Sequence, residues 1–461
     1  MSVVGPSSGA GRETAEAAIP DLGDADFTWV HRRLAEISPA RVSGRVTDVI
    51  GLTIEATGPC APVGSLCEVI GREAGAPVAA EVVGFKTDRL LLMPLGEVRG
   101  IGPGNRVVLV RERPTVRVGS GLLSRVVDGL GNPIDGRPAA VGEVEYPLYG
   151  VQINPLDRRR IREPLDLGIR ALNALLTCGR GQRLGIFAGS GVGKSALLGM
   201  IARYTRADVN VIALVGERGR EVREFIERDL GEGIVHSVVV AATSDQPPLV
   251  RLRGAFLAAS IAEYFRDQGR DVLLMMDSLT RFAMAQREVG LSIGEPPSSR
   301  GYTPSVFAVL PRLIERAGQG RQGSITGLYT VLVEGDDFNE PIADTARALL
   351  DGHVILSRQL AAHGQYPAID VLPSVSRAMI DVVPPEQVEL ANRVRSWLAT
   401  YRDAEDLINI GAYVAGKNPS IDEAVAKMPP IAQFLRQALA EPCDLETARQ
   451  ELQSLVGRRG A

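Results

Sequence analysis

Apolar residues follow a short-strand pattern in the first quarter of the chain. Between Val42 and about Arg113, brief apolar or alternating runs are separated by turns rich in Gly, Pro and Asp, which predicts a small β-barrel. The expected strands are Val42–Val49, Leu52–Ala56, Ala80–Phe85, Leu90–Met93 and Arg106–Val110.

Longer apolar runs alternate with helical segments from about residue 150 to 380. The expected strands there are Arg183–Phe187, Asn210–Val215, Ser237–Ala241, Asp271–Met276 and Leu328–Val333. Nearly continuous apolar strands between helices indicate a mostly parallel sheet that is covered on both faces. From about Pro384 the pattern is helical. The sequence therefore predicts an α/β core with an N-terminal β-barrel and a C-terminal α-helical domain.

The N-terminal segment lacks the patterning of a packed domain. Residues 1–25 are rich in Gly, Ser, Ala and acidic residues, which predicts a disordered tail. A short amphipathic helix is expected over 26–40, with one apolar face formed by Phe27, Val30, Leu34 and Ile37. Such a face docks on a partner or a membrane, or packs on its own domain. The remaining divisions are a barrel over 41–115, a linker rich in Gly and Pro over 116–150, the α/β domain over 151–380 and the helical domain over 381–461.

Composition excludes several classes of protein. The chain has 461 residues, of which 45% are hydrophobic and 23% charged, which is ordinary for a soluble globular protein. A net charge of -4 gives no basic signature for nucleic acid, and no apolar run approaches the ~20 residues that cross a bilayer. The N-terminus has no hydrophobic signal core. Four scattered cysteines form no Cys-x-x-Cys pair, which predicts reduced thiols in a cytosolic protein and no zinc site: Cys60, Cys67, Cys178 and Cys443.

A phosphate-binding loop connects an expected strand to an expected helix. Ala188 precedes the loop where the usual pattern has its first glycine, and the expected nucleotide-binding residues are Gly189, Ser190, Gly191, Val192, Gly193, Lys194 and Ser195. The glycines let backbone N–H groups point at phosphate oxygens, Lys194 reaches the β- and γ-phosphates, and the Ser195 hydroxyl holds Mg²⁺. A loop that merely connects two elements is the alternative. The order of strand, loop, Lys-Ser and helix favours nucleotide binding.

Two carboxylates follow neighbouring apolar runs. Asp277 ends the strand that begins at Asp271, so it is expected beside the phosphate loop, where it holds Mg²⁺ through water. Glu217 follows Val211–Val215 and is expected at the same sheet edge, where a carboxylate orients the attacking water. Arg218 either holds that carboxylate or contacts phosphate. The alternatives are a surface Asp that caps a turn and a solvated charge run.

The segment Tyr366–Arg377, together with the phosphate loop, Gly216-Glu217-Arg218 and the strand that ends at Asp277, resembles the α/β subunits of the rotary ATP synthases. The resemblance implies a RecA-like core and a hexameric ring. It implies that Arg377 is an arginine finger that enters the neighbouring subunit's site, and that Tyr366 is the residue on which adenine stacks. Ordinary core packing is the alternative for Tyr366.

Further segments are similar to the ATPases of flagellar and type III protein export, and they are Glu295–Phe307, Val331–Ile342 and Asp351–Arg358. Asn409–Tyr413 and Pro419–Asp422 resemble the flagellar branch. The resemblance implies a Mg²⁺-dependent ATPase that forms a homo-hexamer at the cytoplasmic face of the inner membrane. The implied partners are export chaperones and substrates, regulatory and stalk proteins and a membrane export gate, with no nucleic acid.

Three alternatives remain open. The first is the same enzyme in a virulence-type secretion system. The second is an RNA-translocating ring helicase that resembles the transcription termination factor, but its barrel should be basic and aromatic, whereas this one carries Glu55, Glu68 and Glu81 and little aromatic beyond Phe85. The third is a non-catalytic ring subunit, which should lack the carboxylate that Glu217 supplies.

Overall fold

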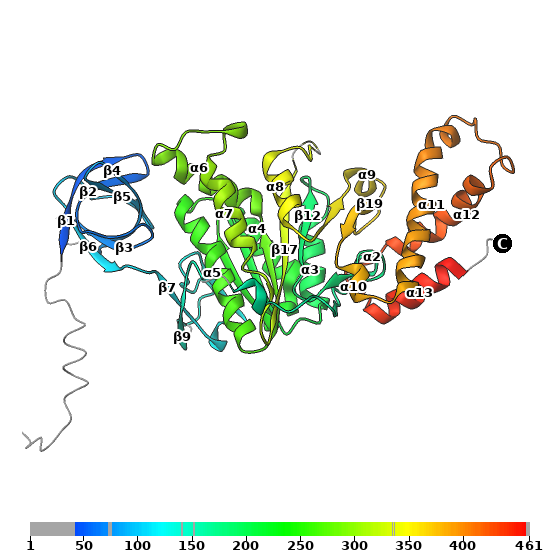
Figure 1. The fold of residues 1–461 in the computed structure, drawn as a ribbon, viewed down its shortest axis with the longest axis horizontal. Coiled ribbons are helices and arrows are strands. Elements are labelled where there is room, and N and C mark those ends of the chain that lie inside the picture. The colour runs from blue at the N-terminus through cyan, green and yellow to red at the C-terminus, as the bar shows by residue number, and fades with distance from the viewer. Residues whose placement is uncertain are drawn as a thin grey trace, which may run out of the picture. The chain divides into compact units, whose positions relative to one another are not determined.

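The computed structural model describes residues 42–71, 76–139, 142–150, 153–333, 335 and 337–457 (Figure 1). The tail and the amphipathic helix expected over residues 1–40 lie outside these residues. Among the described helices, none combines the length and the apolar composition needed to cross a membrane. The four cysteines are free thiols, and Cys60 alone of them is exposed.

The N-terminal domain is a closed barrel, as expected, in the order β1-β2-β5-β4-β3-β6. Its strands are β1 (Ser43–Ile50), β2 (Thr53–Thr57), β3 (Leu66–Ile70), β4 (Val78–Lys86), β5 (Arg89–Pro94) and β6 (Arg106–Arg111). The sequence pattern did not identify β3. That strand closes the barrel because it pairs with both β4 and β6, and its Cys67 and Val69 side chains are fully buried.

The central domain contains the expected mostly parallel sheet. Within the described residues the sheet has nine strands, in the order β19-β18-β12-β17-β15-β13-β14-β8, and β16 pairs with β17 off this path. The strands are β8 (Arg125–Asp128), β12 (Arg183–Ala188), β13 (Val209–Val215), β14 (Ser237–Ala242), β15 (Asp271–Asp277), β16 (Gly318–Gln319), β17 (Ser324–Leu332), β18 (Gly352–Leu356) and β19 (Ile369–Ser376). Two further pairs are β7 (Thr115–Val118) with β9 (Val144–Pro147), and β10 (Pro164–Leu165) with β11 (Cys178–Gly179). The stretch 116–150 thus contributes β8 to the central sheet.

Helices cover both faces of this sheet (Figure 1). The helices of this domain are α2 (Arg170–Leu175), α3 (Lys194–Tyr204), α4 (Gly219–Glu224), α5 (Pro248–Asp267), α6 (Leu279–Ser292), α7 (Pro304–Ile314), α8 (Pro341–Leu349), α9 (Arg358–Ala362) and α10 (Met379–Val382). Successive residues of a strand face opposite sides, and β13 supplies both layers. Val211 and Ala213 lie in the core beneath α5, whereas Ile212 and Leu214 lie in the core beneath α3. This burial on both faces explains the uninterrupted apolar runs.

The C-terminal domain consists of helices, as the pattern predicted. They are α11 (Pro385–Asn409), α12 (Pro419–Leu435) and α13 (Leu445–Gly457). The helix α12 contains Pro429 and Pro430 and continues through both prolines. Ile431 and Phe434 beyond them are buried in the core, so tertiary packing outweighs the two missing N–H donors.

Candidate functional site

The phosphate loop lies between β12 and α3, as predicted. Gly191 and Gly193 have φ of 79° and 87°, a conformation that costs glycine little and other residues more. Gly189 and Val192 are buried, whereas Ser190 and Gly191 are exposed at the tip of the loop. Lys194 and Ser195 open α3, so the positive end of the helix adds to the N–H groups of the loop. The loop therefore presents an anion-binding surface.

Lys194 contacts both expected carboxylates. Its Nζ donates a hydrogen bond to Asp277 Oδ1 and lies 3.7 Å from Glu217 Oε1. Asp277 ends β15 and Glu217 follows β13, and these strands are parallel neighbours with Leu214 opposite Asp277. Glu217 is 8% exposed and Asp277 5% exposed. The structure therefore brings together, at one sheet edge, the cation and the two carboxylates that the sequence identified.

Burial changes the acidity of Glu217. Burial raises its pKa to about 7, the nearby Asp277 charge adds to the rise, and Lys194 and Arg281 oppose it. A carboxyl group that titrates near neutral pH is suited to act as a general base. Asp277 is held by Lys194 and is the more deeply buried of the two.

Arg281, and not Arg218, contacts Glu217. Arg281 Nε donates to Glu217 Oε1 at 3.3 Å from the first turns of α6. The Arg218 guanidinium is 67% exposed and pairs with Glu221 at 3.8 Å. Of the two roles expected for Arg218, holding the Glu217 carboxylate thus falls to Arg281. No motif in the sequence marks Arg281, which comes four residues after Asp277.

Gly216 allows this contact. A side-chain carbon at Gly216 would lie 3.0 Å from carbons of Arg281, and the residue has a φ of 72°. Any larger residue would be strained in backbone and would displace the arginine. The glycine before Glu217 is therefore a spacing element of the site.

Ser195 and Asp277 supply the oxygen ligands expected for Mg²⁺. Both carry hard oxygen atoms, and Mg²⁺ bound with a nucleotide commonly uses one or two protein oxygens, water and phosphate oxygens. Across the described residues, no group of three or more His, Cys, Asp and Glu side chains could hold a metal ion alone. A hydroxyl and one carboxylate beside an anion-binding loop fit Mg²⁺ that arrives with phosphate.

Tyr366 lies against the phosphate loop. A side-chain carbon at Gly193 would be 3.3 Å from two ring carbons of Tyr366. The tyrosine is 46% exposed, so it is not part of a core. It lines a pocket of about 630 Å³ with residues of the C-terminal domain that include Pro430 and Phe434. A flat ring beside the loop, open to a pocket, is placed to stack on a nucleotide base.

Arg377 lies at the other edge of the sheet. The strand β19 is antiparallel to β18. Its first residue, Ile369, pairs with Leu356 at the sheet edge that carries the phosphate loop, and its last residue, Ser376, pairs with Gly352 at the opposite edge. The length of β18 separates these edges by roughly 13 Å. Arg377 is exposed, and within the described chain its guanidinium has no ion pair. It cannot reach the phosphate loop of its own subunit.

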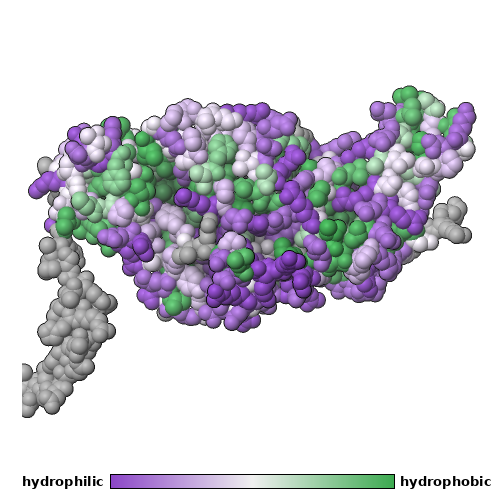
Figure 2. Space-filling view, in the orientation of Figure 1, coloured by the Kyte–Doolittle hydropathy of each residue, from purple (hydrophilic) through white to green (hydrophobic). Residues whose placement is uncertain are grey.

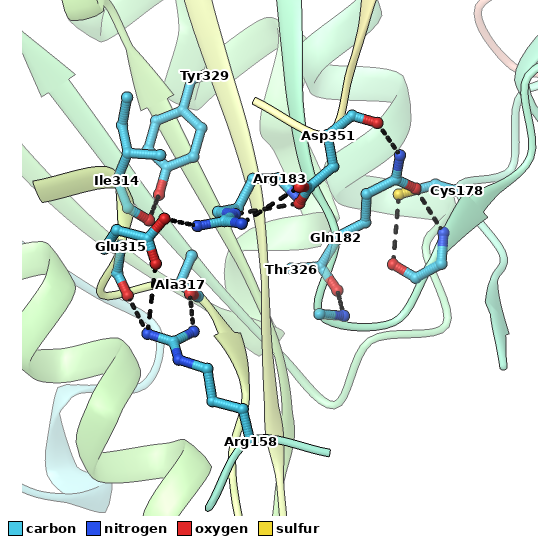
Figure 3. A network of polar contacts seen from close by, with 12 residues as sticks. Arg158, Cys178, Gln182, Arg183, Ile314, Glu315, Ala317, Thr326, Tyr329 and Asp351 are labelled. Atoms are coloured by element: carbon cyan, nitrogen blue, oxygen red, sulfur yellow. Dashed lines mark hydrogen bonds and ion pairs between the residues drawn. The ribbon is translucent and has the colours of Figure 1, made fainter. Parts of the chain in front are cut away.

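A polar network around Asp351 fixes the backbone of Arg377, and Figure 3 shows the part of it formed by Gln182, Arg183 and Asp351. The Arg377 N–H donates to the Asp351 carbonyl at 3.0 Å, and Gln182 Nε2 donates to the same carbonyl at 3.0 Å. Arg183 holds the Asp351 carboxylate through Nε at 3.0 Å and Nη2 at 3.2 Å, and also contacts Glu315. The arginine therefore extends from a rigid base.

A family model matches each of the three domains. Residues 46–110 match the β-barrel domain of the ATP synthase alpha/beta family, and residues 168–376 match its nucleotide-binding domain. Residues 383–454 match the T3SS EscN ATPase C-terminal domain.

Similar proteins span nearly the whole chain. The flagellum-specific ATP synthase of Bacillus subtilis is 54% identical over 90% of this chain and 95% of its own. The type 3 secretion system ATPase of Xanthomonas euvesicatoria is 49% identical over 93% and 97%. The assembled ATPase EscN of enteropathogenic E. coli superposes with a TM-score of 0.85 at 44% identity, over 90% of this chain and 100% of its own. The chain therefore belongs to the ATP synthase alpha/beta family, within the branch of flagellum-specific ATP synthases and type 3 secretion ATPases, and it is an ATPase with a RecA-like core.

Proposed function

We propose that this protein is a Mg²⁺-dependent ATPase of the flagellar protein export apparatus that works as a homo-hexamer and energises or primes the delivery of export substrates. The observation that carries the proposal is the convergence of Lys194, Glu217 and Asp277 at one sheet edge. The 54% identity to a flagellum-specific relative favours the flagellar system.

Each residue near the loop has a distinct role in this proposal. The loop glycines and Lys194 bind the triphosphate, and Tyr366 stacks on adenine. Ser195 and Asp277 hold Mg²⁺, which neutralises phosphate charge when it is bound. Glu217 orients the attacking water and accepts its proton, which a pKa of about 7 allows near neutral pH. Arg281 holds the Glu217 carboxylate at its angle.

The place of Arg377 supports the ring. It is an exposed arginine on a fixed backbone, at the sheet edge opposite its own phosphate loop, where a neighbouring subunit's nucleotide is the one it would serve. EscN has been solved as an assembled ATPase. The surface in Figure 2 is largely polar, with hydrophobic residues on the barrel, where exposed side chains include Ile50, Val63 and Phe85. Such residues are available for contacts between subunits.

The proposed partners follow from the same system. EscN has also been solved in complex with its central stalk EscO, at a TM-score of 0.83 to this chain. We extend this to a stalk protein for the present ring, and with it to regulatory proteins, export chaperones, export substrates and a membrane export gate. The protein would then work at the cytoplasmic face of the inner membrane.

One experiment in cells separates the flagellar system from the virulence-type alternative, which the Xanthomonas relative keeps open. The chromosomal gene is replaced by the Lys194→Ala variant, and flagellar filament protein in the culture medium is measured beside swimming. Loss of both is expected. Normal swimming with loss of other secreted proteins would assign the enzyme to a virulence-type system.

Phosphate release by the purified protein tests the activity itself. Turnover should require Mg²⁺ and ATP together, and it should rise per subunit with protein concentration as rings assemble. Constant turnover per subunit at every concentration would contradict the ring.

A further inference from the structure

Thr330 contacts the carboxylate that the proposed function assigns to Mg²⁺. It lies on β17, beside β15, and is fully buried. Its Oγ1 is 2.6 Å from Asp277 Oδ1 and 3.4 Å from the Met276 carbonyl oxygen. A hydroxyl has one proton to donate, and the shorter distance assigns it to the carboxylate. A hydrogen bond to an ionised acceptor is stronger than one between neutral groups.

Both donors to Asp277 use the same oxygen atom. Lys194 Nζ and Thr330 Oγ1 each donate to Oδ1. Within the described part of the chain, no side chain or backbone group donates to Oδ2. The carboxylate is therefore oriented, with one oxygen turned toward protein donors and the other left free to accept hydrogen bonds from water around a metal ion.

The two hydrogen-bond donors to Asp277 differ in whether they stay on it when nucleotide binds. Lys194 is a flexible arm that the proposed function directs to the phosphates, so its contact with Asp277 competes with nucleotide. Thr330 is fixed by burial on a central strand and has no competing ligand. When Lys194 turns to phosphate, Thr330 is the protein donor that stays on Asp277.

We propose that Thr330 is a positioning residue that fixes the orientation of the Asp277 carboxylate, so that Oδ2 faces the hydrated Mg²⁺ while Lys194 exchanges between Asp277 and nucleotide. The inference rests on the proposed role of Asp277. Loss of the Thr330 hydroxyl should therefore weaken nucleotide binding in the presence of Mg²⁺ and leave binding without Mg²⁺ nearly unchanged.

A purely structural role is the competing explanation, and the chain offers a matched control. Thr326 lies four residues earlier on the same strand and is also buried, at 1% exposed. Its hydroxyl accepts a hydrogen bond from the Gly181 N–H at 2.8 Å, near the far edge of the sheet (Figure 3). Thr330→Val and Thr326→Val therefore each remove one buried hydrogen bond from β17, but only the first touches Asp277.

The experiment is calorimetric titration with the β,γ-imido analogue of ATP, with Mg²⁺ and with EDTA. The measured quantity is the ratio of the two affinities. Thr330→Val should lower this ratio roughly 10-fold or more, as for the loss of a hydrogen bond to a charged group, with little change in EDTA. Thr330→Ser, which keeps the hydroxyl, should restore most of it. Thr326→Val should lower the thermal unfolding midpoint and leave the ratio unchanged.

Specific results would overturn the inference. A wild-type ratio in Thr330→Val, or an equal fall in Thr326→Val, would show that Thr330 only stabilises the strand. Asp277→Ala separates the inference from its premise. If that variant retains the wild-type ratio, the metal role of Asp277 is wrong. Should Thr330→Val fail to fold, Thr330→Ala and Thr330→Ser provide the same comparison of hydroxyl absent against hydroxyl present.

Discussion

Tyr366 and Arg377 flank a single strand, β19, and for that reason they stand at opposite edges of the central sheet. Tyr366 lies against Gly193 of the phosphate loop, whereas Arg377 follows Ser376, which pairs with Gly352 at the far edge. One segment thus serves the subunit's own nucleotide at one end and, in the proposed ring, a neighbour's nucleotide at the other.

Arg377→Ala should bind ATP normally and hydrolyse it slowly at every protein concentration. Its own loop is intact, but the charge that a docked neighbour adds to the transferred phosphoryl group is missing. Arginine fingers in phosphoryl transfer contribute about 10³–10⁵ in rate. Phosphate release and ATP affinity, measured on the same preparation, check this separation of binding from turnover.

A mixture of Arg377→Ala and Lys194→Ala subunits should recover part of the lost turnover. In a mixed ring, some interfaces combine the intact loop of the first variant with the intact arginine of the second. Phosphate release is followed as the ratio of the two variants is varied. If both variants enter rings with wild type and no mixture is active, the trans-acting role of Arg377 is wrong or the ring requires all its sites together.

Glu217→Gln should bind ATP but turn it over at least ~100-fold more slowly, in the usual range for loss of a general base. Glutamine keeps the shape of the side chain and can still face Arg281, so folding and binding should be preserved. Single-turnover phosphate release measures the chemical step directly. Wild-type turnover in this variant would reduce Glu217 to a structural residue.

The value of kcat/KM should rise with pH, and the midpoint of this acidic limb should lie near pH 7. Glu217 must be ionised to act as a base, and burial holds its pKa at about 7 in the free enzyme. Arg281→Met removes a positive charge that lowers this pKa, so the limb should move to higher pH. Arg218→Met is the matched comparison, because its exposed guanidinium pairs with Glu221 and should leave the limb in place. An unmoved limb in Arg281→Met would contradict the electrostatic role of Arg281.

The parts of the fold that the sequence predicted are those whose burial leaves a local pattern. The strands β13 and β14 are buried on both faces and read as unbroken apolar runs, so they were identified almost to the residue. The strand β19 contains Asp370 and Pro373, which are tolerated because it is an edge strand, and it was not identified. The strand β3 was missed because it has only five residues, of which Cys67 and Val69 alone are buried, so its local apolar signal is short and weak.

The site divides in the same way. Lys194, Glu217 and Asp277 follow apolar strands or a glycine-rich loop, so their positions could be predicted from sequence. Arg281 and Thr330 acquire their contacts from tertiary structure alone. Thr330 is one apolar-flanked threonine among several, and only the parallel pairing of β17 with β15 places it 2.6 Å from a carboxylate.

Tyr366→Ala should weaken ATP binding roughly 5- to 150-fold, because stacking of a base on an aromatic ring contributes about 1–3 kcal/mol. Tyr366→Phe keeps the ring and should bind like wild type. The expected change is in KM rather than kcat, since Tyr366 precedes β19 and Glu217 follows β13, and these strands lie on opposite sides of β12 in the sheet. Titration of ATP, with tripolyphosphate as a control ligand that has no base, measures the difference. Equal weakening toward both ligands would indicate damage to the loop at Gly193 instead.

Lys194→Ala should nearly abolish ATP binding and should also make the stability of the nucleotide-free protein depend more steeply on pH. The lysine side chain is 13% exposed and stands between two carboxylates whose side chains are 11% and 7% exposed. Removing it leaves Glu217 and Asp277 facing each other in a poorly hydrated site, so the pKa of Glu217 should rise further above its ordinary value. A carboxyl group whose pKa is raised on folding favours the folded state at low pH, and that contribution is lost as pH rises toward the folded pKa. The thermal unfolding midpoint of the variant should therefore lie further below that of wild type at pH 8 than at pH 5.5. Adding Glu217→Gln to Lys194→Ala removes one of the two charges and should recover part of the loss at pH 8. A deficit that is the same at both pH values would mean that Lys194 does not neutralise this pair.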